Sequence, residues 1–88
     1  MRFEYDPAKA AANLRKHKVS FADAEGVLND PLALTVEDIG SAGERRFVAI
    51  GLGSAGELLV VAYTERKGAY RLISARRPMR KERNQYEG

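Results

Sequence analysis

Two short glycine-containing turns separate three strand-like runs in the second half of the chain. The runs are RRFVAIGL (45–52), ELLVVAYTE (57–65) and YRLISAR (70–76), and the turns are GSAG and RKGA. Turns this short join neighbouring antiparallel strands, because a parallel connection needs a crossover of a dozen or more residues. The middle run is apolar almost throughout, which is typical of a central strand covered on both faces. These runs therefore predict an antiparallel sheet.

Two helices are predicted ahead of these strands. Asp6 followed by Pro7 is a typical helix start, because the carboxylate can accept from free N–H groups and proline fits the first helical position. The alanine-rich stretch AKAAANLRKH continues this helix to near Lys18. A second helix is predicted from its N-cap, Ser20, to the stop signal Asn29-Asp30-Pro31.

Three further segments complete the predicted fold. RFEY (2–5) and LALTV (32–36) read as strands, and PMRKERNQYE (78–87) reads as a final helix opened by Pro78. This last helix is polar nearly all round, so we expect it to dock loosely. The class is α+β: a small antiparallel sheet with two N-terminal helices and one C-terminal helix.

Length and composition limit the kind of protein this is. The 88 residues hold one core, so residues 1–88 are predicted to form a single domain. The chain has no cysteine and one histidine, which leaves no disulfide, no thiolate nucleophile and no multi-histidine metal site, so no metal or other cofactor is expected. No apolar run is long enough to span a membrane, and the N-terminal stretch does not resemble a signal peptide. We therefore expect a cytoplasmic protein without a membrane partner.

Positive charge is concentrated near the C-terminus. Residues 1–65 carry 7 basic and 10 acidic side chains, whereas residues 66–83 carry 8 basic and 1 acidic side chain, a net charge of +7. Such a segment is typical of a protein that contacts phosphate groups, although an acidic protein would also fit it.

The single histidine has two readings. His17 follows Lys16 in the last turn of the first predicted helix, where the helix dipole favours cations, so residue type alone favours a solvated side chain. The alternative is an imidazole that accepts a proton during a reaction on a phosphate-bearing partner.

The arginines of the basic segment can bind phosphate or remain solvated. Arg71 and Arg76 are five apart, so on a regular strand they point to opposite faces, with Leu72 and Ser74 on the face opposite Arg71. Arg76 is the stronger candidate, because sheet positions are rigid. Tyr86 can stack on a base or anchor the last helix. The residues expected to contact nucleic acid are Arg71, Arg77, Arg80, Lys81, Arg83 and Tyr86.

Two carboxylates, Glu44 and Glu82, are candidate proton acceptors. Glu44 precedes Arg45 at the start of a strand, where a salt bridge is the favoured alternative to chemistry. Glu82 is expected to pair with a basic residue on its own helix.

Several separated pieces together resemble one family. FEYDPAKAAANLRKHKVSF, ADAEGVLNDPLAL, GERRFVAIG, LLVVAYTER and RLISARRPMRKERNQYE, taken in this order from Phe3 to Glu87, are similar to the BrnT toxins of bacterial type II toxin–antitoxin systems. Lys18 stands where members usually have glycine, Tyr5 where tryptophan is common, and Pro78 where a small residue is usual.

The resemblance implies a RelE-like fold, a ribonuclease that slows growth by cutting RNA, and a cognate antitoxin. That antitoxin would bind DNA and, as a complex with the toxin, repress their shared operon. By motif, the residues expected to carry activity are Lys16, His17, Glu44, Arg45, Arg66 and Arg76.

A cut without a metal ion is the simplest mechanism for these residues. RNA carries its own nucleophile, the 2′-OH, so the protein must move protons and stabilise charge on the phosphate. His17 or Glu44 would handle the proton, while Lys16, Arg66 and Arg76 would stabilise the charge. The alternatives are a nucleic-acid-binding module without chemistry and a protein-interaction domain.

Overall fold

The computed structural model describes residues 2–38 and 45–88, and its elements follow the predicted order. In chain order they are β1 (Arg2–Glu4), α1 (Pro7–His17), α2 (Phe21–Asn29), β2 (Leu34–Asp38), β3 (Arg46–Leu52), β4 (Leu58–Arg66), β5 (Ala69–Arg76) and α3 (Arg80–Glu87). The last helix begins two residues later than predicted: Met79 is its N-cap, so Arg80 and not Pro78 is the first helical residue.

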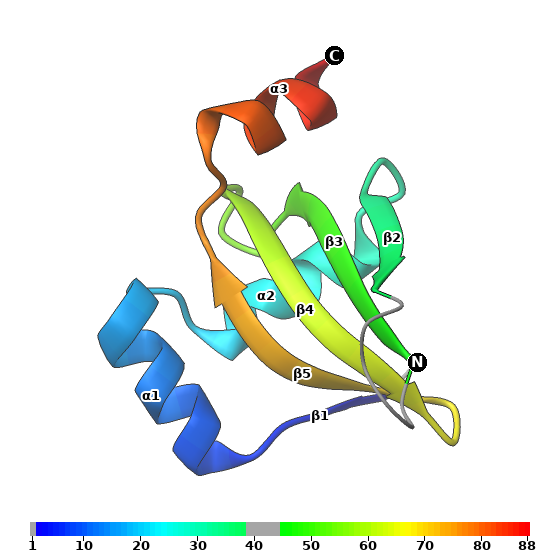
Figure 1. Ribbon diagram of the computed structural model, residues 1–88. Coiled ribbons are helices and arrows are strands. Elements are labelled where there is room, and N and C mark those ends of the chain that lie inside the picture. The colour runs from blue at the N-terminus through cyan, green and yellow to red at the C-terminus, as the bar shows by residue number, and fades with distance from the viewer. Residues whose placement is uncertain (1, 39–44) are drawn as a thin grey trace.

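The strands form one sheet in the order β1-β5-β4-β3-β2 (Figure 1). The predicted antiparallel hairpins β3–β4 and β4–β5 are confirmed, and β2 pairs with β3 in the same sense. β1 instead pairs with β5 in parallel, with Phe3 opposite Tyr70, so the sheet is mixed and not wholly antiparallel. Two helices and three strands separate β1 from β5, which gives the chain ample length for a parallel crossover.

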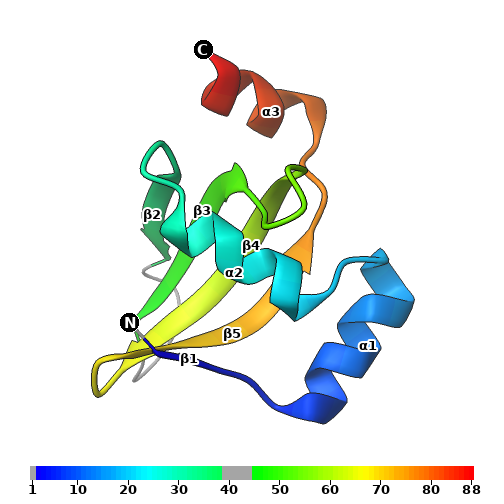
Figure 2. The ribbon, with the colours of Figure 1, turned by 180° about the vertical axis from the view of Figure 1, so that it is seen from behind.

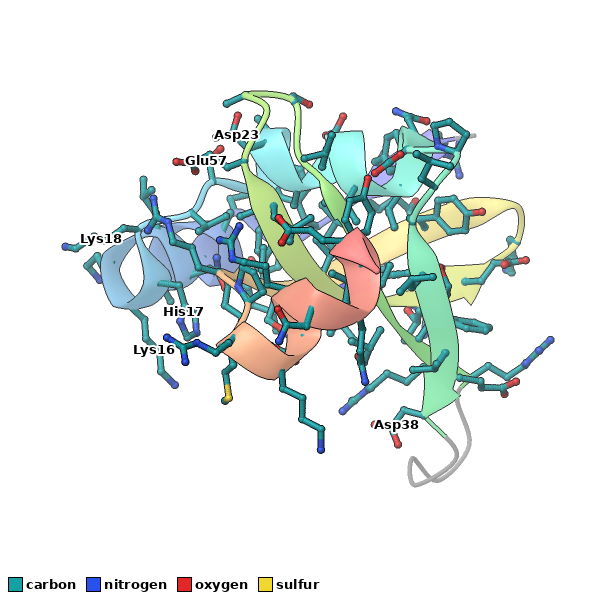
Figure 3. All side chains as sticks on the ribbon, turned by 90° about the horizontal axis from the view of Figure 1, so that it is seen from above. Lys16, His17, Lys18, Asp23, Asp38 and Glu57 are labelled. Atoms are coloured by element: carbon teal, nitrogen blue, oxygen red, sulfur yellow. The ribbon has the colours of Figure 1, made fainter. Side chains whose placement is uncertain are left out.

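The two faces of the sheet are covered unequally. α2 lies across one face, where Phe21, Ala24 and Val27 pack with Leu59 and Val61 in the main core (Figure 2). α3 lies at one end of the other face, as the view from above shows (Figure 3). Most of this second face is therefore left uncovered by helices, so side chains that point to it can meet another molecule.

α1 runs beside β5 at the edge of the sheet (Figure 1). The predicted cap is confirmed, since the Ala8 N–H donates to Asp6 Oδ1 over 2.9 Å. Its C-terminal turn carries Arg15, Lys16 and His17, and the helix ends at Lys18 in the left-handed conformation. Among the described residues, no helix is long and apolar enough to cross a membrane.

β5 is not a regular strand. Tyr63 of β4 pairs with Leu72 but Ala62 pairs with Ser74, so Ile73 is an extra residue, a β-bulge. One extra residue reverses the alternation beyond it, which turns Arg76 to the same face as Arg71. The prediction that these two arginines point to opposite faces is therefore wrong, as is the expectation that Leu72 and Ser74 share a face.

α3 docks through defined contacts and not loosely. Tyr86 packs against a small cluster of Ile50, Leu58 and Val60, and its hydroxyl donates to Asp30 Oδ2 over 2.6 Å. This bond lowers the pKa of Asp30 and raises the pKa of Tyr86. Tyr86 therefore serves as the anchor that the sequence left as one of its two readings.

Candidate active site

An open pocket of about 230 Å³ lies between α1 and β5. Its lining side chains come from one face of α1 and from the bulged part of β5. They are Lys9, Ala12, Asn13, Lys16, His17, Ile73 and Ser74. We call this space the α1–β5 pocket. Four of these lining residues carry an ammonium, an imidazole or a hydroxyl group: Lys9, Lys16, His17 and Ser74.

The end of α1 sets how the histidine is presented. Lys16 and His17 lie together at the helix end, while Lys18 projects from another side of it (Figure 3). His17 is half-buried, so it is not the freely solvated side chain that residue type alone favoured. Lys18 takes φ 61°, and its N–H donates to Leu14 O, which closes the helix. A lysine thus reaches the left-handed conformation that glycine adopts more easily.

Arg76 ends β5 and is held by the last helix. Its Nη1 and Nη2 each donate to a carboxylate oxygen of Glu82, both over 2.8 Å, and Nη1 also donates to Arg77 O. The Glu82 carboxylate also accepts from the Met79 N–H at the start of α3. Glu82 therefore pairs with a strand arginine and not with a basic residue on its own helix, because only residues 77–79 separate the end of β5 from the start of α3.

This ion pair changes the acidity of both partners. Hydrogen bonds from Arg76 lower the pKa of Glu82 to about 2, more than burial raises it. The same carboxylate raises the pKa of Arg76. The pair is therefore fully charged at neutral pH, and Arg76 keeps a fixed orientation.

Arg45 and Arg66 lie at the other end of the sheet. Along β4, Val60 pairs with Arg76, and Arg66 follows six residues later, which places the two arginines about 20 Å apart. Arg45 makes two 3.1 Å hydrogen bonds to Glu37, which lower the pKa of that carboxylate. Of the expected active residues that the structure describes, only Lys16 and His17 line the α1–β5 pocket; Arg76 follows the pocket strand but pairs with Glu82, and Arg45 and Arg66 lie at the other end of the sheet. Glu44 lies outside the described residues.

The residues expected to contact nucleic acid are mostly exposed. Arg80, Lys81 and Arg83 project from α3, and Arg83 is 3.6 Å from Glu87 in an i,i+4 pair. Arg77 lies 3.5 Å from Glu57. Arg71 is half-buried on the open face of the sheet. Arg77, Arg80, Lys81 and Arg83 form a charged margin from the end of β5 onto α3, whereas Arg71 lies near the start of β5.

The sequence did not point to three polar lining residues of the pocket: Lys9, Asn13 and Ser74. The spacing of Lys9, Asn13 and Lys16 is compatible with one helix face, a signal that was available. Nothing in the sequence marked Ser74, because only the bulge at Ile73 turns it away from the core.

A second hollow, of about 470 Å³, lies between α3 and the strands β2 and β3. Its lining includes Leu34, Val36, Val48 and Ile50. This groove is mainly apolar, and Glu82, which also lines it, is paired with Arg76.

A family model described as "Ribonuclease toxin, BrnT, of type II toxin-antitoxin system" matches residues 5–82. The chain belongs to the BrnT family. It shares 25% sequence identity with the structure described as "1.1 Angstrom-resolution crystal structure of the Brucella abortus ribonuclease toxin, BrnT", at a TM-score of 0.66. That match covers 91% of this chain and 99% of the other. Comparison with curated proteins found no significant match.

BrnT membership agrees with the α+β architecture and with the expected class of protein. The family consists of ribonuclease toxins of type II toxin–antitoxin systems, so an antitoxin protein is implied as a partner. The resemblance noted in the sequence is confirmed over nearly the whole chain.

Proposed function

We propose that this BrnT toxin is an endoribonuclease that cuts RNA at the α1–β5 pocket through the 2′-OH, without a metal ion. The observation that carries the proposal is the pocket itself, which Lys9, Lys16, His17 and Ser74 line. Two ammonium groups attract a phosphodiester, and a neutral imidazole can accept a proton.

The reaction balances with groups already at this site. The 2′-oxygen forms a bond to phosphorus while the bond from phosphorus to the 5′-oxygen breaks, which leaves a 2′,3′-cyclic phosphate. His17 takes the 2′-OH proton, and an ammonium group, of Lys9 or Lys16, returns a proton to the leaving 5′-oxygen. The extra negative charge on the phosphate is stabilised by Lys16 and Arg76.

Arg76 can serve this role without leaving Glu82. A guanidinium has five N–H donors, and three of them are engaged with Glu82 and Arg77. Two donors remain for a phosphate oxygen. Glu82 would thus orient the arginine, as carboxylate partners orient cations in other preorganised sites.

Arg45 and Arg66 have a different part in this proposal. About 20 Å of sheet separates them from Arg76, so they lie too far from it to act on the same phosphate. Glu44 remains the alternative proton acceptor from the sequence.

The test is cleavage of a defined RNA by wild-type protein, His17→Ala and Arg76→Ala, with binding measured separately on 2′-O-methyl RNA, which has no nucleophile. We expect the maximal rate to fall by about 10²–10⁴ for His17→Ala and about 10²–10³ for Arg76→Ala. Lys67→Ala removes a charge from the distant β4–β5 turn and should leave the rate unchanged.

Three results would contradict the scheme. These are a wild-type rate abolished by EDTA, products with a 5′-phosphate, and full activity in His17→Ala. Binding to RNA with no cleavage at all would instead favour the nucleic-acid-binding module.

We also propose that a cognate antitoxin neutralises this activity and, as a DNA-binding complex with the toxin, represses their operon. The test is induced expression in bacteria with and without the neighbouring antitoxin frame. Growth arrest that the antitoxin relieves supports the proposal, and harmless expression of the toxin alone contradicts it.

A further inference from the structure

We propose that Asn13 is a positioning residue that holds the proton-transfer side of the α1–β5 pocket against β5. The inference rests on the proposed function, because it gives Asn13 a part in that reaction. Asn13 is 7% exposed and is one of two buried polar side chains in the described parts of the chain.

Three hydrogen bonds fix the Asn13 amide. Its Nδ2 donates to Ala75 O and to Val19 O, each over 2.9 Å, and its Oδ1 accepts from the Ala75 N–H over 3.1 Å. Two bonds to one residue set the direction of approach as well as the distance. The third ties the same amide to the start of the next segment, just after the left-handed Lys18.

The amide takes the place of a neighbouring strand. β1 pairs with β5 only over residues 69–71, so the edge of β5 beyond the bulge has no strand beside it. Asn13 satisfies both the N–H and the C=O of Ala75 at that edge, as a paired strand residue would. Ala75 itself points into the core, and its neighbours Ser74 and Arg76 point the other way.

The two hydrogen bonds between Asn13 and Ala75, which we call the Asn13 clamp, therefore join the α1 side of the site to the β5 side. Lys16 and His17 lie three and four residues after Asn13, on the same helix face. Ser74 and Arg76 flank the residue to which Asn13 is bonded. Loss of the clamp would let α1 shift along β5, which would separate the imidazole from the hydroxyl and guanidinium while leaving every charge in the protein.

The experiment compares Asn13→Ala and Asn13→Asp with wild-type protein. Single-turnover cleavage at saturating RNA gives the chemical rate, and anisotropy with 2′-O-methyl RNA gives binding. We expect the rate to fall about 10- to 100-fold with binding changed less than twofold, since a small misplacement of reacting groups costs this much. Asn13→Asp keeps the size and an acceptor for the Ala75 N–H but loses both donations, so its rate should be no higher than that of Asn13→Ala. Its carboxylate also adds a negative charge beside Lys16 and His17, so only for this variant is weaker RNA binding expected.

Val27→Ala is the matched control. Val27 is fully buried in the core and lines no part of the pocket, so its truncation lowers stability without loosening α1. All variants are assayed at a temperature where circular dichroism shows each one folded. A rate for Asn13→Ala that equals that of Val27→Ala would overturn the inference.

A second measurement does not depend on cleavage. The ring resonances of His17, the only histidine, can be followed by NMR. They should shift or broaden in Asn13→Ala and stay in place in Val27→Ala. Unchanged His17 resonances in Asn13→Ala would overturn the positioning role, whereas inactive wild-type protein with shifted resonances would overturn only the proposed function.

Discussion

At the scale of single residues, Lys18 occupies a backbone conformation that suits glycine. A residue with a side chain pays roughly 1–2 kcal/mol to adopt the left-handed conformation, and glycine avoids this cost. Glycine also makes the unfolded chain more flexible, which offsets part of the stabilisation. We expect Lys18→Gly to raise the free energy of unfolding by about 0.5–1 kcal/mol, measured by urea denaturation.

Arg15→Gly is the contrasting variant for this prediction. Arg15 lies in the right-handed last turn of α1, so glycine there should lower stability by about 1 kcal/mol. Equal effects of the two substitutions would show that the conformation of Lys18 stores no strain.

The ion pair of Glu82 predicts how the stability of the protein depends on pH. Its pKa is lowered from 4.5 to about 2 in the folded protein, so its pairing with Arg76 contributes fully above pH 4.5 and is lost as pH falls toward 2. The Arg76 side chain is 35% exposed, which limits the contribution to about 1 kcal/mol at pH 7. Glu82→Gln should therefore be less stable than wild-type protein at pH 7, and this difference should shrink between pH 5 and pH 2.

Glu87→Gln is the matched control on the same helix. Glu87 forms an exposed i,i+4 pair with Arg83, for which a loss of at most about 0.5 kcal/mol is expected. A stability difference for Glu82→Gln that stays constant with pH would contradict the assignment.

At the scale of elements, α3 is held against the rest of the protein mainly by the side chains of Tyr86 and Glu82. The Tyr86 hydroxyl joins α3 to Asp30, just after α2, and the ring covers Ile50. Tyr86→Phe keeps the ring but removes this bond, so we expect a loss of about 1 kcal/mol and faster hydrogen exchange of α3 amides.

The same variant separates the two readings of Tyr86. Phenylalanine retains a stacking surface, so RNA affinity that depends on stacking would survive while α3 loosens. Tyr5→Phe is the control, because Tyr5 is exposed and contacts Phe21 through its ring. Unchanged exchange in Tyr86→Phe would mean that packing alone holds α3.

At the scale of the whole molecule, charge should govern RNA affinity. Each phosphate contact on single-stranded RNA contributes about 0.7 to the slope of log affinity against log salt. Replacing Arg80, Lys81 and Arg83 together by glutamine should therefore reduce that slope by about 2, measured by anisotropy at several salt concentrations.

The double variant Arg2→Gln/Lys67→Gln tests whether position matters. Both cations are exposed at the end of the sheet opposite Arg76, although Lys67 belongs to the same basic stretch of sequence. Its slope should change little. An equal reduction per charge in both variants would mean that RNA binds without regard to the α3 margin.

Local signals predicted most of the elements because their causes lie within a few residues. Asp6 and Ser20 cap their helices as expected, through bonds to the second and third residues beyond them. The hairpins β3–β4 and β4–β5 follow from turns that are too short for any other pairing. The parallel pairing of β1 escaped prediction because its partner lies more than 60 residues away.

The candidate site, like the fold, has features that the sequence predicted and features that only the tertiary structure showed. Sequence by itself determined the elements, the basic segment and the family, since caps, turn lengths and motifs are properties of neighbouring residues. Only the tertiary structure decided which of the six expected residues lie together. The bulge at Ile73, the pairing of Arg76 with Glu82 and the Asn13 clamp to Ala75 all depend on how distant segments meet. Contacts between α1 and β5 are set by packing, which no local pattern encodes.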